Sequence, residues 1–141
     1  MSMALFVILA DDRSPTAVAW QKGLNEHDVP IQFVKGTNLR RQGVIPLRLR
    51  GRKSSFQFFI ESFAEMSAEY PQLANITLPS PVIYSMVYQG DLLEAASAFY
   101  AASVLVARFG GVAFDPSGSD FITEGELLDA AREFEVLARH K

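Results

Sequence analysis

The pattern of apolar and polar residues along the chain predicts a mixture of strands and helices. An unbroken apolar run over residues 4–10 is typical of a strand that is covered on both faces. Ser14 and Pro15 then predict a helix start, with Ser14 as the N-cap and Pro15 at the first helical position. Apolar residues at helical spacing predict that this helix ends near His27, and a short strand is predicted over residues 31–34.

The middle of the chain predicts a β-hairpin. Residues 44–50 alternate between apolar and polar positions, which is typical of a half-exposed strand, and Pro46 indicates an edge position in the sheet. A turn at residues 51–53 leads into a second strand over residues 55–61. A short helix is predicted over residues 62–70, because its apolar residues follow a helical spacing.

The C-terminal half carries the strongest pattern. A strand is predicted over residues 82–88, followed by a helix over residues 91–109 that is apolar on nearly every face and therefore buried. Gly110 and Gly111 predict a left-handed end to that helix, and residues 112–114 predict a short strand.

The last predicted helix begins with a capping box formed by Thr123 and Glu126. Its expected inner face consists of Leu127, Ala130, Phe134 and Leu137. Central strands with helices before and after them favour an α+β fold. We therefore predict a single domain over residues 1–141, with a mixed, largely antiparallel β-sheet that contains a β-hairpin and has about three helices packed on it.

Composition narrows the chemistry that this domain can perform. The 141 residues include no cysteine, which excludes disulfides, thiol catalysis and cysteine-ligated metal centres, and only His27 and His140 supply imidazole. The longest uncharged apolar run, residues 95–107, is too short to span a bilayer. The N-terminal apolar run lacks the basic region and cleavage site of a signal peptide. We expect a cytoplasmic protein without a membrane partner.

Two groups of acidic residues are candidate ion sites. Asp11 and Asp12 follow the first strand, where ligand sites often occur, but the sequence lacks the further Asp and late Lys of a phospho-acceptor site. Residues 115–120 are rich in oxygen ligands, but they lack calcium-loop spacing and are explained by turn chemistry. No catalytic set can be assembled from these residues. We expect no enzyme activity, no cofactor and no metal; a deep pocket with two close carboxylates would revive the enzyme hypothesis.

Charge is segregated along the chain. Residues 35–53 hold seven of the thirteen basic residues and no acidic residue, whereas residues 54–141 hold twelve acidic and four basic residues. A hairpin within residues 40–53 could bind small anions or nucleic acid through Arg48, Arg50 and Arg52. Phe56, Phe58 and Phe59 would then offer stacking faces. The alternative is that the arginines protect a sheet edge from aggregation, and the acidic remainder argues against nucleic acid.

Three glutamates give a sharper signal. Glu61, Glu65 and Glu69 follow i, i+4, i+8 spacing and would project from one face of the short helix. Like charges placed in this way cost a few tenths of a kcal/mol for each pair. Either the arginines of the neighbouring hairpin compensate them within the fold, or a basic partner does so in a complex.

A series of packing and turn motifs lies between residues 44 and 120. These motifs are Gly51, Phe56–Phe58, Ile83–Tyr84, Gly90–Asp91 and, after an Ala-rich helix, Gly110–Pro116. In these motifs the chain resembles small bacterial immunity proteins, which neutralise polymorphic toxins or toxins delivered by type VI secretion. Such families have no catalytic residues that could be carried over to this sequence.

The resemblance implies a cytosolic inhibitor that binds one cognate toxin molecule and blocks its active site or an essential surface. Many toxins that act in the cytosol are nucleases with basic surfaces. We therefore expect the contact at Glu61, Glu65 and Glu69, with Arg48, Arg50 and Arg52 as the second candidate contact. The sequence leaves the identity of the toxin and the oligomeric state open, a homo-oligomer included.

Overall fold

The computed structural model describes residues 3–139, so His140 lies outside the described residues. It contains a seven-stranded sheet with the order β2-β3-β4-β5-β1-β6-β7, in which every pairing is antiparallel. The strands are β1 (Met3–Ala10), β2 (Ile31–Phe33), β3 (Gly43–Leu49), β4 (Arg52–Glu61), β5 (Pro81–Tyr88), β6 (Val112–Asp115) and β7 (Asp120–Ile122). The predicted α+β fold class is confirmed, while the last of these strands was not predicted.

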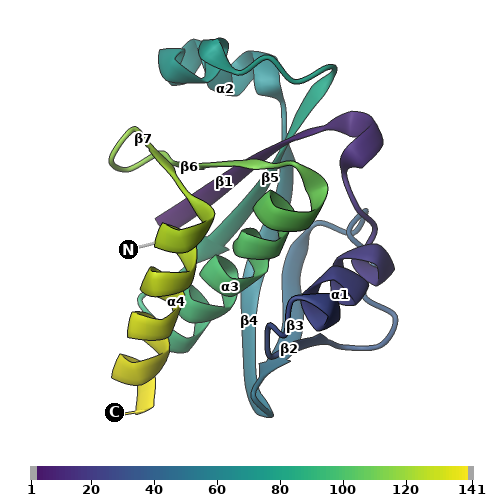
Figure 1. Ribbon diagram of the computed structural model, residues 1–141, viewed down its shortest axis with the longest axis vertical. Coiled ribbons are helices and arrows are strands. Elements are labelled where there is room, and N and C mark those ends of the chain that lie inside the picture. Colours follow the sequence, from purple (N-terminus) through teal and green to yellow (C-terminus); the bar gives the residue numbers. More distant parts are fainter. Residues whose placement is uncertain (1–2, 140–141) are drawn as a thin grey trace.

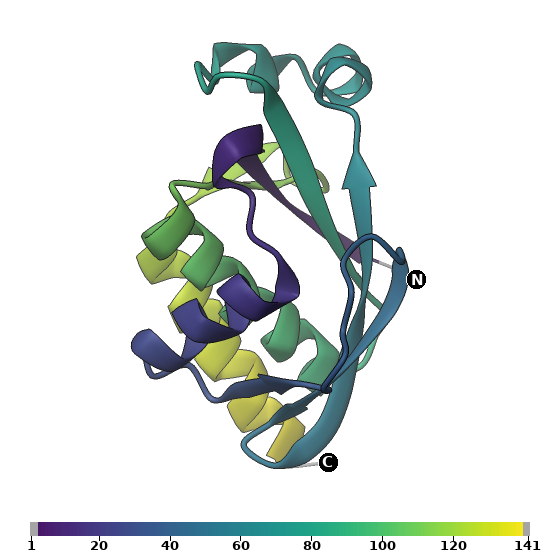
Figure 2. The same cartoon turned by 90° about the vertical axis from the view of Figure 1, so that its right-hand side faces the viewer.

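The described residues form four α-helices, where about three were expected. They are α1 (Ala17–Glu26), α2 (Phe63–Glu69), α3 (Leu92–Phe109) and α4 (Glu124–Arg139). Two short 3₁₀ helices, η1 (Asp11–Arg13) and η2 (Pro71–Asn75), add to them. Helices α1, α3 and α4 cover one face of the sheet, while α2 lies apart from them on the other side of β1 and β6 (Figures 1 and 2).

The main core lies between the sheet and the three helices α1, α3 and α4. Trp20 of α1 is fully buried in it, where its indole nitrogen donates a hydrogen bond of 3.1 Å to the Ala101 carbonyl of α3. By length and hydropathy α3 is the one helix of residues 3–139 that could cross a membrane. However, 67% of it is buried inside the fold. Such burial is typical of the core helix of a globular domain. Helix α3 ends as predicted at Gly110, which adopts a φ of 72°.

A smaller core lies on the other face of the sheet, between β1 and the segment formed by α2 and η2. Alternate residues of β1 divide between the two cores, so that Phe6 and Ile8 enter the smaller one. Tyr70 packs edge-on against Phe6 and Phe114, with ring centroids 6.0 and 5.7 Å apart. The continuous apolar run of β1 is thus explained, because both faces of this strand are covered.

Two predicted boundaries were wrong. Helix α1 begins at Ala17 with Thr16 as its N-cap, whereas the Ser14 hydroxyl donates to the Asp11 carbonyl and closes η1. The hairpin turn consists of Arg50 and Gly51 alone, with φ values of 49° and 81°. Two adjacent residues with positive φ are typical of the tight turns whose twist matches a hairpin, so β4 starts already at Arg52.

Pro46 does not lie on an edge strand, because β3 pairs with both β2 and β4. Its carbonyl accepts a hydrogen bond of 3.3 Å from Val34, the residue after the last residue of β2. The position that lacks an N–H therefore faces the point where β2 has ended. Proline cannot donate a hydrogen bond to a neighbouring strand. This is tolerated where the neighbouring strand has ended, just as it is on an edge strand.

Helix α4 begins with the predicted capping box. The Glu126 carboxylate accepts from the Thr123 N–H at 3.0 Å, and the Thr123 hydroxyl accepts from the Glu126 N–H at 3.2 Å. Of the predicted inner face, Leu127 is buried and Ala130 and Phe134 pack against the main core, but Leu137 is 46% exposed and was predicted wrongly. The residues buried on α4 are Leu127, Ala131, Glu135 and Ala138. A charged residue, Glu135, thus faces the interior beside the apolar residues of the helix.

Candidate interaction surface

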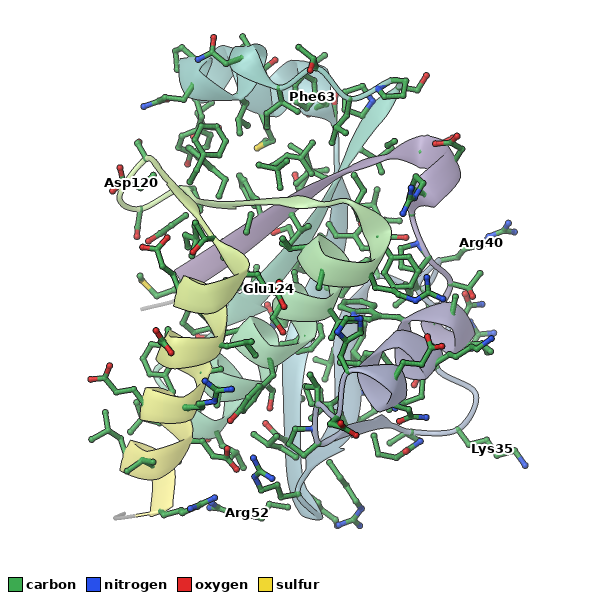
Figure 3. All side chains as sticks on the ribbon, viewed as in Figure 1. Lys35, Arg40, Arg52, Phe63, Asp120 and Glu124 are labelled. Carbon is green, nitrogen blue, oxygen red and sulfur yellow. The ribbon has the colours of Figure 1, made fainter. Side chains whose placement is uncertain are left out.

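The predicted arginines and glutamates lie at opposite ends of the sheet. Strand β4 begins at Arg52 and ends at Glu61, and ten extended residues span about 30 Å. Figure 3 shows Arg52 at one end of the molecule and Phe63, the first residue of α2, at the other. Compensation of the glutamates by the hairpin arginines is therefore wrong. We refer below to the hairpin end (residues 48–53) and the α2 end (residues 61–69).

At the hairpin end, Arg50 pairs with a buried carboxylate, although half of its own side chain is exposed. Its Nε donates to Glu135 Oε2 at 2.7 Å, and the Tyr100 hydroxyl donates to Glu135 Oε1 at 2.7 Å. Arg139, one turn later on α4, lies 3.4 Å from the same carboxylate. This network joins the β3–β4 turn to α3 and α4. Arg50 therefore has a structural contact within the fold, in which its Nε is engaged by Glu135.

The protonation of this network follows from its contacts. Burial alone would raise the pKa of Glu135, but hydrogen bonds from Tyr100 and Arg50, together with the charges of Arg50 and Arg139, outweigh it and lower the pKa. Burial, followed by the hydrogen bond to Glu135, raises the pKa of the Tyr100 phenol. The carboxylate is therefore held ionised and the phenol neutral, which is the arrangement of a stable ion pair.

The remaining hairpin residues differ from the predicted arrangement of cations beside aromatic stacking faces. Arg48 and Arg52 are exposed, and Arg48 donates to the Gly51 carbonyl at 2.9 Å within the turn. The proposed stacking faces were wrong in part, because Phe56 is 1% and Phe58 0% exposed in the main core. Residues 35–53 do not gather on one surface either: Lys35, Arg40 and Arg52 project at three separate places (Figure 3).

At the α2 end, the three glutamates do not share a helical face. Glu61 is the last residue of β4, and Ser62 ends the strand by accepting a hydrogen bond from Glu65 N–H as the N-cap of α2. Only Glu65 and Glu69 lie on the helix, where both are exposed. Burial and the adjacent Glu69 carboxylate together raise the pKa of Tyr70. Within residues 3–139 none of the three glutamates forms an ion pair.

The antiparallel register brings a fourth carboxylate to the α2 end. Ala10 of β1 pairs with Pro81 of β5, and Glu61 of β4 pairs with Ile83 of the same strand. Asp11 therefore lies across β5 from Glu61, and the two line one groove of about 510 Å³. The other lining residues are Ser62, Phe63, Ala64, Ser80, Pro81 and Val82. We call this the acidic groove: its lining is mostly apolar, includes two carboxylates and contains no cation.

In the sequence Asp11 and Glu61 belong to two separate groups of acidic residues, fifty residues apart. A signal for their proximity existed in the apolar patterns of β1, β5 and β4. This signal can be used only when the strand order is known, because β5 lies between β1 and β4. Local patterns do not determine strand order.

Of the two candidate ion sites, residues 115–120 form the predicted turn, while Asp11 and Asp12 lie in the first turn of η1. The Asp115 carboxylate accepts from the Ser117 N–H at 3.0 Å and from its hydroxyl at 2.7 Å, as predicted for a turn between β6 and β7. The positive φ falls on Ser119, at 54°, and not on Gly118. In the part of the chain that the structure describes, no group of three or more His, Asp or Glu residues is placed to hold a metal.

In comparisons with known proteins, no family model, no curated protein and no solved structure matches this chain.

Proposed function

We propose that this protein is an immunity protein that binds a cognate secreted antibacterial toxin in the cytoplasm and neutralises it by forming a one-to-one complex. The observation that carries the proposal is the acidic groove, together with Glu65 and Glu69 beside it. The described part of the chain contains four ion pairs, and none of them involves these carboxylates. Such a surface favours a basic partner, which it attracts over a distance of several ångströms.

The interior of the protein is also consistent with an inhibitor that has no catalytic group. Every described buried side-chain nitrogen or oxygen has a hydrogen-bond partner. The carboxylate with the strongest set of contacts, Glu135, is held ionised by structural partners. An immunity protein needs a rigid scaffold and a complementary surface, and it needs no catalytic group. The resemblance of residues 44–120 to immunity proteins supports the same conclusion.

The first experiment is capture of the partner and assay of its toxicity. We expect one stoichiometric protein that is toxic when it is expressed alone and harmless when it is co-expressed with this chain. Affinity is then compared between the wild type and the variant E61K/E65K/E69K. Loss of the acidic surface should weaken binding at least about tenfold and make the remaining affinity less sensitive to salt.

A matched control removes the effect of net charge. The variant E124K/D129K/E133K changes three exposed acidic residues of α4 by the same total charge. It should retain nearly all of the affinity. Equal affinity in both variants and the wild type would exclude the α2 end as the contact, and a non-toxic partner would exclude the immunity function.

The alternative, an anion- or nucleic-acid-binding hairpin, has less support from the structure. Of its three arginines, Arg50 is engaged by Glu135, and two of the three aromatic rings are in the core. Titration with single-stranded DNA at two salt concentrations tests this alternative directly, because binding through the remaining hairpin cations would weaken steeply with salt.

A further inference from the structure

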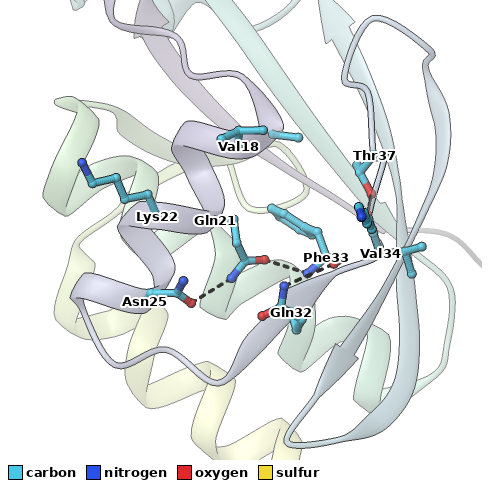
Figure 4. A pocket seen from close by; sticks show the side chains of 11 residues that line it. Val18, Gln21, Lys22, Asn25, Gln32, Phe33, Val34 and Thr37 are labelled. Carbon is cyan, nitrogen blue, oxygen red and sulfur yellow. Dashed lines mark hydrogen bonds between the residues drawn. The ribbon is translucent and has the colours of Figure 1, made fainter.

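A second groove lies at the far edge of the sheet, between helix α1 and the edge strand β2 (Figure 4). Its volume is about 510 Å³, and it is open to solvent. One wall is formed by α1, through Ala17, Val18, Gln21, Lys22 and Asn25. The other wall is one continuous stretch of backbone, residues 32–37. A helix that runs beside an exposed strand edge is a geometry into which an extended peptide fits.

The strand edge in this groove is held by side chains. On the inner side of β2, Pro30 and Val34 make backbone hydrogen bonds to the neighbouring strand. On the outer side, the Ile31 carbonyl accepts from Gln21 Nε2 at 2.8 Å, and the Phe33 N–H donates to Gln21 Oε1 at 2.7 Å. A single glutamine amide thus occupies the position that the backbone of another strand would take.

A single side chain covers the edge of a strand less completely than a neighbouring strand does. The Gln21 amide satisfies two backbone groups, and its nitrogen also donates to Asn25 Oδ1 at 3.0 Å (Figure 4). The next outward group, the Phe33 carbonyl, is met by Gln32 only at 3.5 Å. Unpaired edge groups are a template for strand pairing, and a rotamer change of one residue would expose them here.

The groove also offers apolar contact and positive charge. Val18 is 80% and Val34 50% exposed, although both are large hydrophobic residues. Lys22 and Lys35 line the groove, and none of its eleven lining residues is acidic. In a chain with a formal charge of −3, this local excess of positive charge is the opposite of the charge at the α2 end.

We propose that the groove between α1 and β2 binds an extended acidic peptide segment of a partner protein, which adds to the sheet beside β2 and displaces the Gln21 amide. The backbone of the segment bonds Ile31 and Phe33. Alternate apolar side chains of the segment contact Val18 and Val34, and its carboxylates contact Lys22 and Lys35. This site goes beyond the proposed toxin contact, since it lies elsewhere on the molecule and selects the opposite charge.

The test uses a synthetic heptapeptide of alternating Glu and Val, blocked at both termini, titrated into ¹⁵N-labelled protein. We expect saturable binding, with the largest amide shifts at Phe33, Lys35 and the groove side of α1. A peptide methylated on alternate backbone nitrogens cannot make the strand bonds, and a Lys-Val peptide has the wrong charge. Both should bind at least about tenfold more weakly.

Protein variants locate the contact. The variant K22E/K35E should lose at least about tenfold in affinity, while R52E/K53E, which changes the same charge at the hairpin end, should bind as the wild type does. Gln21→Ala removes the competitor for the strand edge and should tighten binding. The variant E61K/E65K/E69K should bind the peptide unchanged, which keeps this result separate from the proposed toxin contact.

Three results would overturn the proposal. They are an absence of shifts at β2 at millimolar peptide, equal binding of the methylated peptide, and equal losses in K22E/K35E and R52E/K53E. Shifts at β2 that depend on protein concentration without peptide would assign the edge to a second copy of the chain instead.

Discussion

The hairpin end and the α2 end of the sheet contain similar numbers of charged residues but use them differently. At the hairpin end, Arg50 reaches a carboxylate that is only 5% exposed, and Tyr100 completes its hydrogen bonds. At the α2 end, Glu65 and Glu69 are exposed and have no ion-pair partner among residues 3–139. The first group forms contacts within the fold, whereas the second has no ion pair there and is the contact that we propose for a partner.

This difference has a physical origin in burial. A buried carboxylate is tolerated only when its charge is paired and its oxygens are hydrogen-bonded, so Glu135 needs both Arg50 and Tyr100. An exposed carboxylate is solvated by water and needs no partner, so exposed carboxylates can accumulate at little cost to stability. Charge that the fold does not use is therefore found where burial is low, and this is the surface on which binding can be selected.

The largest expected effect comes from breaking the buried network. Glu135→Ala should lower the free energy of unfolding by about 3 kcal/mol, because it leaves the Tyr100 hydroxyl and the Arg50 guanidinium without their partner. Urea denaturation followed by circular dichroism measures the change. The control Glu133→Ala, two residues earlier on the exposed side of α4, should stay within about 0.5 kcal/mol. Equal losses in the two variants would contradict a structural role for Glu135.

A smaller effect is expected from pH. The pKa of Glu135 is lowered from its ordinary 4.5 in the folded protein, so the stability that its charge contributes is complete above pH 4.5. That contribution is lost as the pH falls through the lowered folded pKa. The difference in unfolding free energy between the wild type and Glu135→Gln should therefore shrink as the pH falls below 4.5. A difference that stays constant with pH would show that the charge itself contributes nothing.

The smallest effect on stability is expected at the α2 end. The variant E65A/E69A removes two like charges at i, i+4 spacing, and should change the free energy of unfolding by only a few tenths of a kcal/mol, in the stabilising direction. The same urea titration measures it. A loss of more than about 1 kcal/mol would mean that these carboxylates support the fold, and the contrast between the two ends would then no longer hold.

Much of the fold was predictable from local patterns, and the errors have identifiable causes. The continuous apolar strand β1 and the core helix α3 were predicted almost to the residue, because their patterns depend on burial on all sides. On α4, Leu137 was wrongly assigned to the inner face and Glu135 was missed, because a glutamate was assumed to face water. The start of α1 was wrong because Ser14 is equally suited to closing a 3₁₀ turn, and only Thr16 caps the helix.

The candidate sites were less predictable than the fold. Glu61, Glu65 and Glu69 were identified as a group, and they do lie together at one end of the molecule. However, the helix that was expected to align them begins after Glu61, because Ser62 is its N-cap. The role of Gln21 left no trace in the sequence, since a glutamine on an exposed helical position is ordinary until the strand edge beside it is known.

The sequence by itself determined the α+β class, the capping box of α4, the left-handed end of α3 and the separation of basic and acidic segments. These features depend on residues close together in the chain, whose geometry is set by local sterics and hydrogen bonding. Only the tertiary structure decided that Arg50 pairs with Glu135, that Asp11 and Glu61 line one groove, and that Gln21 covers the edge of β2. Each of these depends on strand order and on packing between distant segments, which the pattern of any single segment does not contain.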